Sequence, residues 1–488
     1  MAPVPSSVAT LSRDFVVPLW LDGQQKETVN TFKVISPKTQ KHLWSASSAG
    51  LEDAEAAVVS AQKAFETWRL TKPYERRDIF LKAYHLLKER REQSMGFSTT
   101  ETGVPEVMFG FEYNGAMDIC YQLASIAGTD KGFVVDPEAR DTSAMVIREP
   151  YGVVLGIAPW NAPHALAIRA CLFPLAAGNT VVLKGPELAP ATMWHLVEIL
   201  HEAGLPAGCL NTIYHRPEDA IQITEHLVQH PAIRKVNFTG STAVGASIAS
   251  LCGRSIKPCV LELGGKAPAI VCEDADLELA AEQCALASFG HAGQVCMSTE
   301  RIIVRREVVE EFKSAFKAVI SKIFCGDDAP LPILINEKSA DKNRALVKDA
   351  LTKGARILTG GMETSADTPS NRMQPTVLEN VEKSMRIFYE ESFGPLVSIY
   401  VVDSDDDAVA LANDTRYGLT SAVFTSNLGR GMKLAKRIDA GAVHINNMTI
   451  HDESALPHGG SKYSGYGRFN GVDGLREWSK VKSITWRD

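Results

Sequence analysis

The first apolar pattern in the chain has the spacing of helices. Between Leu51 and Trp68 the apolar residues recur every three or four positions, which predicts an amphipathic helix. A second pattern of the same kind runs from about Arg76 to Arg91 and predicts another helix. We therefore expect the early part of the chain to be rich in helix.

After Tyr151 the pattern changes to short β-branched runs that alternate with helical segments. Such alternation is typical of βαβ units and a parallel sheet. The predicted strands are YGVVLGIA at 151–158, NTVVLK at 179–184, NTIYH at 211–215 and KVNFTG at 235–240. The helices predicted between and after them are one that ends at Ala176, two that cover 191–203 and 217–228, and one that begins at Ala243.

The alternation resumes after Gly265 and predicts a second α/β unit. Between the units, the segment ELGGK at 262–266 carries paired glycines where a chain can cross from one domain to the other, so we expect a hinge there. The predicted strands are KAPAIVCE at 266–273, RIIVRREV at 301–308, LVSIYVV at 396–402, SAVFT at 421–425 and AVHIN at 442–446, with helices at 277–291 and near 310–323.

Two strand-like segments fit neither unit, SAMVIREP at 143–150 and VKSITW at 481–486. An alternating strand needs a partner edge, and another subunit can supply that edge. We therefore expect both segments to be oligomerisation strands. The alternative is a local two-stranded flap.

The composition is that of a large globular protein. The chain has 488 residues, of which 45% are apolar and 22% charged, so roughly two to four domains are expected. The net charge of −7 argues against nucleic acid as a partner. No apolar run reaches the roughly 18 to 20 residues that span a bilayer, so we expect no membrane segment.

The cysteines and the N-terminus indicate the compartment. The sequence has nine cysteines and no CxxC metal or redox pair, so we expect no metal site. The first twenty residues lack the basic and apolar segments of a secretion signal. Reduced thiols in the cytoplasm fit these features best.

The segment FTGSTAVG at 238–245 is a candidate phosphate-binding turn. It ends a predicted strand and opens a helix, so free N–H groups around Gly240, Ser241 and Gly245 can hold a pyrophosphate. The GxGxxG fingerprint is absent, and small residues at such a turn also serve simple packing.

Lys184 and Glu187 are candidate ribose ligands. Lys184 ends a predicted strand, and strand ends of a parallel sheet point at the ligand crevice. Together the two side chains can hydrogen-bond two ribose hydroxyls. The alternative is a solvated lysine followed by a glutamate at a helix start.

Three residues are candidates for the chemistry. Cys296 in GQVCMSTE is predicted on a loop at a domain junction, where a thiol can reach a substrate, whereas Cys171 and Cys284 lie in apolar runs and are expected to fill space. Glu262 stands between apolar residues that would raise its pKa toward neutrality, as suits a general base; a structural salt bridge is the alternative. Asn161 in PWNAP can donate to an oxyanion or cap a turn.

Taken together, these motifs resemble those of the NAD(P)-dependent aldehyde dehydrogenase superfamily. The resemblance runs from about residue 18 to the C-terminus, and the joint occurrence of seven motifs is very specific. The motifs, in the family's order and spacing, are PWNAP at 159–163, the segment 184–187, FTGSTAVG, ELGGK, GQVC at 293–296, EESFGP at 390–395 and GGSKYSGYGR at 459–468.

The resemblance implies an α/β fold of the aldehyde dehydrogenase type. Its parts are a Rossmann-type cofactor domain, a second α/β catalytic domain and a small β oligomerisation flap. On this chain the cofactor-binding domain is then 1–132 and 151–262, the catalytic domain 263–445, and the oligomerisation strands 133–150 and 475–488.

It also implies roles for single residues: Cys296 is the nucleophile, Glu262 the general base and Asn161 the oxyanion donor. The segment NTIYHRPEDA at 211–220 lacks the glycine-rich turn of many members, which puts contacts to the adenine end in doubt. The implied cofactor contacts are Ile157, Trp160, Lys184, Ser241 and Leu263, with Glu391 and Phe393 at the nicotinamide ribose and ring.

The implied reaction oxidises an aldehyde to its carboxylic acid and reduces NAD(P), through a thiohemiacetal and a thioester on Cys296. Glu262 favours hydrolysis of the thioester, since transfer to coenzyme A needs no such base. NAD is expected over NADP because Glu187 can bond a free ribose 2′-hydroxyl and repel a 2′-phosphate, although dual use stays open. The rival from another class is a non-catalytic protein that keeps the fold.

The segments WNAPHALAIRA at 160–170 and HINNMTIHDESALPHGG at 444–460 resemble the salicylaldehyde and vanillin branch, which implies an aromatic aldehyde. Arg169 lies about two turns beyond Asn161 and is expected to face the same side, where it can bond a ring hydroxyl or, alternatively, pair with an acid. His458 puts a polar group near the pocket and disfavours aliphatic substrates. A broad-specificity, aliphatic or semialdehyde dehydrogenase is the alternative, and a homodimer or homotetramer is expected.

Overall fold

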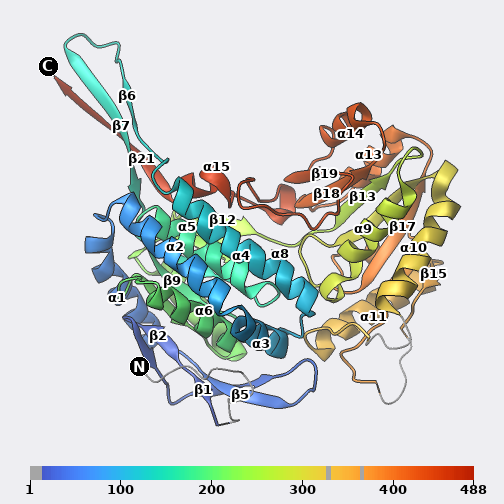
Figure 1. Cartoon of the computed structure of the whole chain (residues 1–488), viewed down its shortest axis with the longest axis horizontal. Coiled ribbons are helices and arrows are strands. Elements are labelled where there is room, and N and C mark those ends of the chain that lie inside the picture. Colours follow the sequence, from blue (N-terminus) through green and yellow to red (C-terminus); the bar gives the residue numbers. More distant parts are fainter. Residues whose placement is uncertain (1–13, 326–330, 363–367, 488) are drawn as a thin grey trace.

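The computed structural model describes residues 14–325, 331–362 and 368–487 (Figure 1). The segment 1–13, which makes up most of the N-terminal stretch without the features of a secretion signal, lies outside the described residues. None of the helices in the described ranges combines the length and the apolar character needed to cross a bilayer.

The first unit is built on an eight-stranded sheet in the order β20-β12-β11-β8-β9-β10-β2-β3. The five strands from β8 to β12 are parallel, as the alternation predicts, while β2, β3 and β20 add antiparallel edges. The bounds are β2 (Leu19–Leu21), β3 (Gln24–Lys26), β8 (Val153–Ile157), β9 (Thr180–Lys184), β10 (Leu210–Ile213), β11 (Ile233–Thr239), β12 (Cys259–Glu262) and β20 (Gly465–Tyr466).

Helices cover this sheet. The two predicted helices are confirmed as α1 and α2, with α2 ending at Glu89, and the sequence did not predict α3. The long α4 was not foreseen, because its many apolar residues do not form a single stripe. The bounds are α1 (Leu51–Trp68), α2 (Pro73–Glu89), α3 (Arg91–Thr102), α4 (Glu106–Ile126), α5 (Pro163–Ala176), α6 (Pro190–Glu202), α7 (Ala220–Gln229) and α8 (Thr242–Arg254).

The second unit is a seven-stranded sheet in the order β15-β16-β17-β14-β13-β18-β19, parallel except for β15. Its strands are β13 (Ala267–Val271), β14 (Thr299–Arg305), β15 (Arg356–Thr359), β16 (Thr376–Glu379), β17 (Leu396–Val402), β18 (Thr420–Phe424) and β19 (Ala442–Ile445). Its helices are α9 (Leu277–Phe289), α10 (Val309–Phe324), α11 (Glu337–Thr352), α12 (Arg386–Tyr389), α13 (Asp405–Asn413) and α14 (Leu428–Ala435).

The segment 263–266 connects β12 of the first sheet to β13 of the second, so the chain crosses between the units where the paired glycines predict it. A Cβ on Gly265 would lie 2.2 Å from the carbonyl oxygen of Cys296. Glycine is therefore required for this close approach of two backbones. Movement at this hinge stays a prediction.

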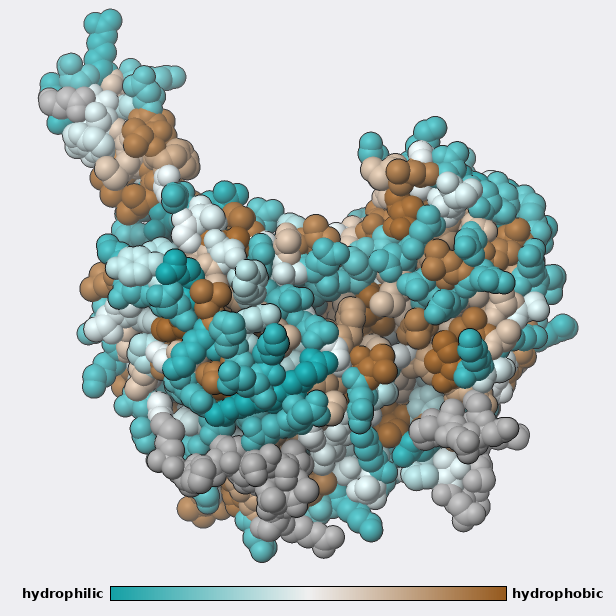
Figure 2. Space-filling view, viewed as in Figure 1, coloured by the Kyte–Doolittle hydropathy of each residue, from teal (hydrophilic) through white to brown (hydrophobic). Residues whose placement is uncertain are grey.

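A third sheet projects from the body of the molecule as an arm (Figure 1). It consists of β6 (Phe133–Val135), β7 (Thr142–Pro150) and β21 (Ser479–Arg487). The segments 143–150 and 481–486, for which the sequence predicts no partner within the chain, lie on β7 and β21. These two strands pair with each other, antiparallel, over nine residues, which corresponds to the flap alternative. Apolar side chains on the arm are exposed, as Figure 2 shows in brown.

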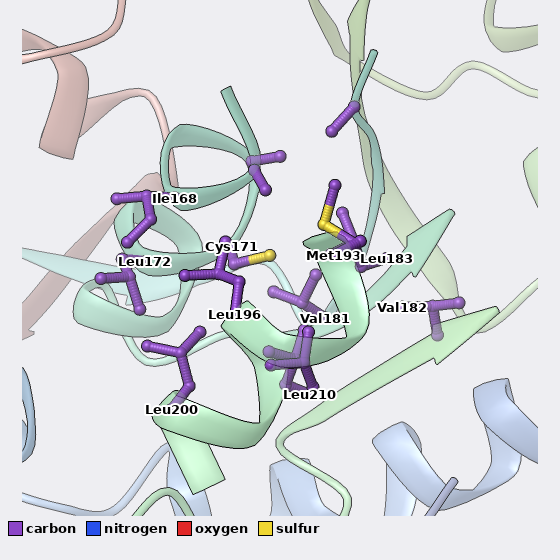
Figure 3. Packing of buried hydrophobic residues seen from close by; sticks show 14 of the residues in the cluster. Ile168, Cys171, Leu172, Val181, Val182, Leu183, Met193, Leu196, Leu200 and Leu210 are labelled. Carbon is purple, nitrogen blue, oxygen red and sulfur yellow. The ribbon is translucent and has the colours of Figure 1, made fainter. Parts of the chain in front are cut away.

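A smaller sheet, β1 (Val16–Val17), β4 (Thr31–Ile35) and β5 (His42–Ser47), lies beside the first unit. The core of that unit packs α5 and α6 over the parallel sheet; Figure 3 shows Leu172 and Leu196 among its members. Cys171 belongs to the same cluster and fills space, as expected. After β19 the chain returns to this unit through β20 and α15 (Gly471–Arg476), and Phe469 and Trp478 are buried in its core.

Candidate active site

A cavity of about 280 Å³ lies where the two units and the returning C-terminal segment meet. Side chains from α4, α5, the end of β12 and the loop 291–297 line it, together with Ile450 and Asp452. Most of the wall is apolar, with Val104, Met108, Phe111, Leu166, Val295 and Ile450 among its members. The three predicted catalytic residues Cys296, Glu262 and Asn161 all line this one cavity.

Cys296 is partly exposed on the loop between η3 (Gly290–Gly293) and β14, as predicted. Burial and the nearby carboxylates of Glu262 and Glu391 raise the pKa of its thiol well above the ordinary value, while Arg169 acts in the opposite direction. The thiol is therefore protonated at rest, and attack on a carbonyl needs a positive charge or a base beside it.

Asn161 is buried just before α5, and the structure holds its amide rigidly. Its Nδ2 donates to the carbonyl oxygen of Gln294 at 3.0 Å, which leaves the second N–H free of that bond and able to donate to an oxyanion. Sequence reasoning missed Gln294. This fully buried side chain donates to Ile333 at 3.0 Å and accepts from the N–H of Ile335 at 2.8 Å, so it anchors the cysteine loop.

Glu262 is the last residue of β12 and is 1% exposed. Its Oε1 accepts a hydrogen bond from Nε2 of His458 at 2.8 Å and lies 3.5 Å from Nη1 of Arg169. The expected rise in its pKa is wrong: burial does act to raise it, but His458 and Arg169 outweigh burial, and the pKa of Glu262 is lowered. The apolar sequence neighbours did not reveal these two partners.

Arg169 lines the cavity together with Asn161, as their spacing predicts, but its guanidinium is paired with acids. It donates to Asp452 and lies near Glu262, the arrangement that the sequence left as the alternative. His458 does not belong to the cavity wall that the described residues form; it lies behind Glu262. Asp452 was missed as a site residue, although its loop had been singled out.

The predicted cofactor residues gather at the carboxyl ends of the parallel strands. Ile157 and Lys184 are paired neighbours on β8 and β9, and β11 ends beside them, where Ser241 caps α8. Burial lowers the pKa of Lys184, and its Nζ has one long contact, 3.5 Å, to the Gly185 carbonyl. A lysine at the strand ends beside an exposed helix N-terminus is an arrangement that can hold a dinucleotide.

Glu391 and Phe393, the residues predicted to hold the nicotinamide, are fixed by their neighbours. Oε1 of Glu391 accepts from the N–H of Gly265 at 2.8 Å, and burial and Glu300 raise its pKa to about 7. Phe393 has a positive φ of 48° and lies edge-on to Trp160, with ring centroids 6.2 Å apart. These side chains are thus held in place before any cofactor binds.

The other predicted cofactor residues pack closely around α8. A Cβ on Gly245 would lie 2.4 Å from the end of the Leu263 side chain, so a larger residue there would displace that side chain. Gly240 precedes the cap residue Ser241, while Glu187 lies elsewhere, partly exposed, three residues after Lys184. No group of three or more metal-ligating side chains is found in the described ranges.

Comparisons with known proteins point to a single enzyme family. The model of the aldehyde dehydrogenase family matches residues 20–484. Vanillin dehydrogenase of Pseudomonas fluorescens is 41% identical over 96% of this chain and 97% of its own. The crystal structure of a salicylaldehyde dehydrogenase from Pseudomonas putida G7, complexed with salicylaldehyde, has a TM-score of 0.93 at 34% identity and covers 97% of this chain and 98% of its own. Betaine aldehyde dehydrogenase of Staphylococcus aureus, solved with NAD+, has a TM-score of 0.92 at 31% identity, with 98% and 95% covered.

Proposed function

The chain belongs to the aldehyde dehydrogenase family and is an NAD(P)-dependent aldehyde oxidoreductase, and we propose that it oxidises neutral aromatic aldehydes to their carboxylic acids. The observation that carries this proposal is the apolar cavity of about 280 Å³ with Cys296 in its wall. An aromatic ring fits such a cavity with its aldehyde carbon at the thiol.

In the first half of the reaction, the thiol of Cys296 loses its proton to solvent, the sulfur bonds to the aldehyde carbon, and the carbonyl oxygen becomes an oxyanion. The amide of Asn161, fixed by Gln294, donates a hydrogen bond to that oxyanion. When bound, the oxidised cofactor supplies a positive ring that favours the thiolate and the acceptor for the hydride. Loss of the hydride from the carbon leaves a thioester on Cys296.

In the second half, Glu262 takes a proton from water, and the water oxygen attacks the thioester carbon. The carbon–sulfur bond then breaks and the carboxylic acid leaves, and the proton on Glu262 passes to the sulfur of Cys296, which restores both groups. Glu262 suits this task because it is ionised and lines the same cavity as Cys296. The non-catalytic alternative conflicts with the gathering of all three groups around one cavity.

The charges of the cavity disfavour aldehydes that carry a carboxylate. Glu112, Asp118 and Asp452 belong to its wall, and Arg169 is already engaged by Asp452 and Glu262. An anionic semialdehyde would meet like charges without a free cation, which opposes binding. Vanillin and salicylaldehyde, the substrates in the names of two relatives, are aromatic and carry no carboxylate.

The experiment is a substrate series in which kcat/KM is measured for benzaldehyde, hydroxylated benzaldehydes, hexanal and succinate semialdehyde. We expect the aromatic aldehydes to lead and the semialdehyde to be poorest. Hexanal or the semialdehyde as the best substrate would contradict the proposal. Arg169→Ala, measured on the same series, tests whether this residue also bonds a ring hydroxyl: an equal loss on all substrates would argue against it.

Three finer statements complete the proposal. NAD is preferred over NADP because Glu187 can hydrogen-bond a free ribose 2′-hydroxyl and repels a 2′-phosphate. The protein is a homodimer or homotetramer in which the exposed edge of β21 and the apolar side chains of the arm are covered by another copy. It works in the cytoplasm, where its nine cysteines remain free thiols.

A further inference from the structure

On the basis of the reaction proposed above, we propose that a buried cluster of side chains positions Glu262, holding its Oε1 and leaving Oε2 to take the proton from the attacking water. We call this cluster the carboxylate clamp. Its members are Arg169, Asp452, His458 and Asn470. In this proposal they act as positioning residues: His458 and Arg169 contact Glu262, and Asp452 and Asn470 hold Arg169.

One oxygen of Glu262 makes both contacts with the clamp. Oε1 accepts from His458 at 2.8 Å and faces Arg169 at 3.5 Å. Oε2 is buried and has no hydrogen-bond partner among the described residues. A buried carboxylate oxygen without a donor is unfavourable, and the water of hydrolysis is the donor that the reaction brings. The two oxygens therefore have different tasks.

The guanidinium of Arg169 is held on its other side as well. It donates to Oδ2 of Asp452, and its Nε donates to Oδ1 of Asn470 at 3.3 Å. Nδ2 of Asn470 in turn donates to Oδ1 of Asp452 at 2.8 Å, which closes the ring of contacts. Arg169 is thus oriented by three polar groups, and its planar fork cannot turn without breaking them.

His458 is fixed by its backbone. It exchanges two hydrogen bonds with Phe469, at 2.8 and 2.7 Å, so the two strand-like segments brace each other. A carboxylate only accepts, so Nε2 of His458 carries the proton in its bond to Glu262. The side chains of Glu262, Arg169 and His458 are between 1% and 6% exposed, and neighbouring atoms restrict their rotamers.

The clamp also sets the charge of the base. The groups that face Glu262 are His458, Arg169, Asp452 and Cys296; the first two favour the carboxylate and keep its pKa below the ordinary value. A carboxylate with a low pKa is a weak base, so its contribution depends on orientation toward the water. His458 and Arg169, two fixed donors at Oε1, supply this orientation.

The test compares variants at His458 by the burst of reduced cofactor and by steady turnover. His458→Phe removes the donor to Oε1, and His458→Gln keeps an N–H donor of similar reach. We expect His458→Phe to keep a burst of about one reduced cofactor per site while steady turnover falls about tenfold or more, since general-base catalysis contributes about 10²- to 10⁴-fold. His458→Gln is expected to recover most of the turnover.

A double variant separates positioning from a structural role. In the background of Glu262→Gln, His458→Phe is expected to cause no further loss, because it acts through the carboxylate that is already absent. The matched control is His451→Phe, the same replacement in the same loop at a side chain that contacts Glu453 and Asn447. We expect this control to keep the wild-type burst and turnover.

Three results would overturn the clamp: unchanged turnover in His458→Phe, loss of its burst in parallel with turnover, or an equal further loss in the background of Glu262→Gln. A failure of the proposed function has a different signature. In that case the wild-type protein itself would form no reduced cofactor from aromatic aldehydes.

Discussion

Glu262 accepts a hydrogen bond from His458 at 2.8 Å, although 196 residues separate them in the chain. Glu262 ends a strand of the first sheet, whereas His458 follows the last strand of the second sheet, on the segment that returns to the first unit. The base of the proposed reaction is thus completed only when the C-terminal part of the chain has docked. This relationship links assembly of the fold to hydrolysis.

The nucleophile can be tested by Cys296→Ala. Aldehyde oxidation should fall to background because the variant cannot form the thiohemiacetal, while cofactor binding should be retained because the strand-end crevice is untouched. Absorbance of the reduced cofactor reports the first quantity and quenching of tryptophan fluorescence by NAD the second. Substantial turnover in the variant would remove Cys296 from the role of nucleophile.

Glu262→Gln should separate the two halves of the reaction. Hydride transfer precedes the step that needs the base, so the variant is expected to give a rapid burst followed by turnover slowed by about 10²-fold or more. Rapid-mixing absorbance measures both phases. If the burst vanished together with turnover, Glu262 would act before hydride transfer, for instance on the thiol of Cys296.

The lowered pKa of Glu262 predicts a pH profile. The base works as a carboxylate, and because its pKa lies below the ordinary glutamate value of about 4.3, kcat should not fall with acid until below that value. Arg169→Met removes a cation that favours the carboxylate. The pKa then rises, and the acid limb of kcat should move to higher pH. The measurement is kcat as a function of pH for the wild type and for Arg169→Met, over the pH range in which circular dichroism shows both proteins folded. An acid limb at the same pH in both proteins would contradict the prediction.

Cofactor choice can be tested at Glu187. Replacing it by glutamine removes the charge that repels a 2′-phosphate, so kcat/KM with NADP relative to NAD should rise about tenfold, equal to about 1.4 kcal/mol. Glu187→Asp keeps the charge and is the matched control, expected to retain the preference for NAD. A wild-type efficiency with NADP equal to that with NAD would already overturn the assignment.

The arm offers a test of assembly. Ile484 and Trp486 are 38% and 43% exposed on β21, and alternate positions of a strand share one face. The double variant Ile484→Asp, Trp486→Asp places two carboxylates on that face. If another copy covers the face, these carboxylates would be buried at the interface, so the protein should sediment as a smaller species. Thr485→Asp, on the opposite face, is the control. Equal sedimentation of all three proteins would exclude this face from the interface.

Local patterns in the sequence determined much of the fold. The spacing of apolar residues predicts α1 to the residue, and the alternation after Tyr151 predicts the parallel strands from β8 to β11. The seven motifs identified the family that the comparisons then showed. These features depend on neighbours within about twenty residues, where periodicity and turn chemistry are readable. The sequence did not predict the antiparallel edge strands β2 and β20, because a strand of two or three residues is too short to show an alternating pattern.

The sequence by itself also determined which three residues meet at the cavity, because their motifs identify them one by one. Only the tertiary structure decided their electrostatics. Apolar neighbours in sequence suggest a raised pKa for Glu262, but its surroundings in space include His458 and Arg169, from segments far along the chain, and these lower it. Charge acts through space over several ångströms, so no local pattern records it. In the same way, the pairing of 143–150 with 481–486 was decided by the docking of two distant segments, since a strand edge is satisfied by whichever partner the fold brings to it.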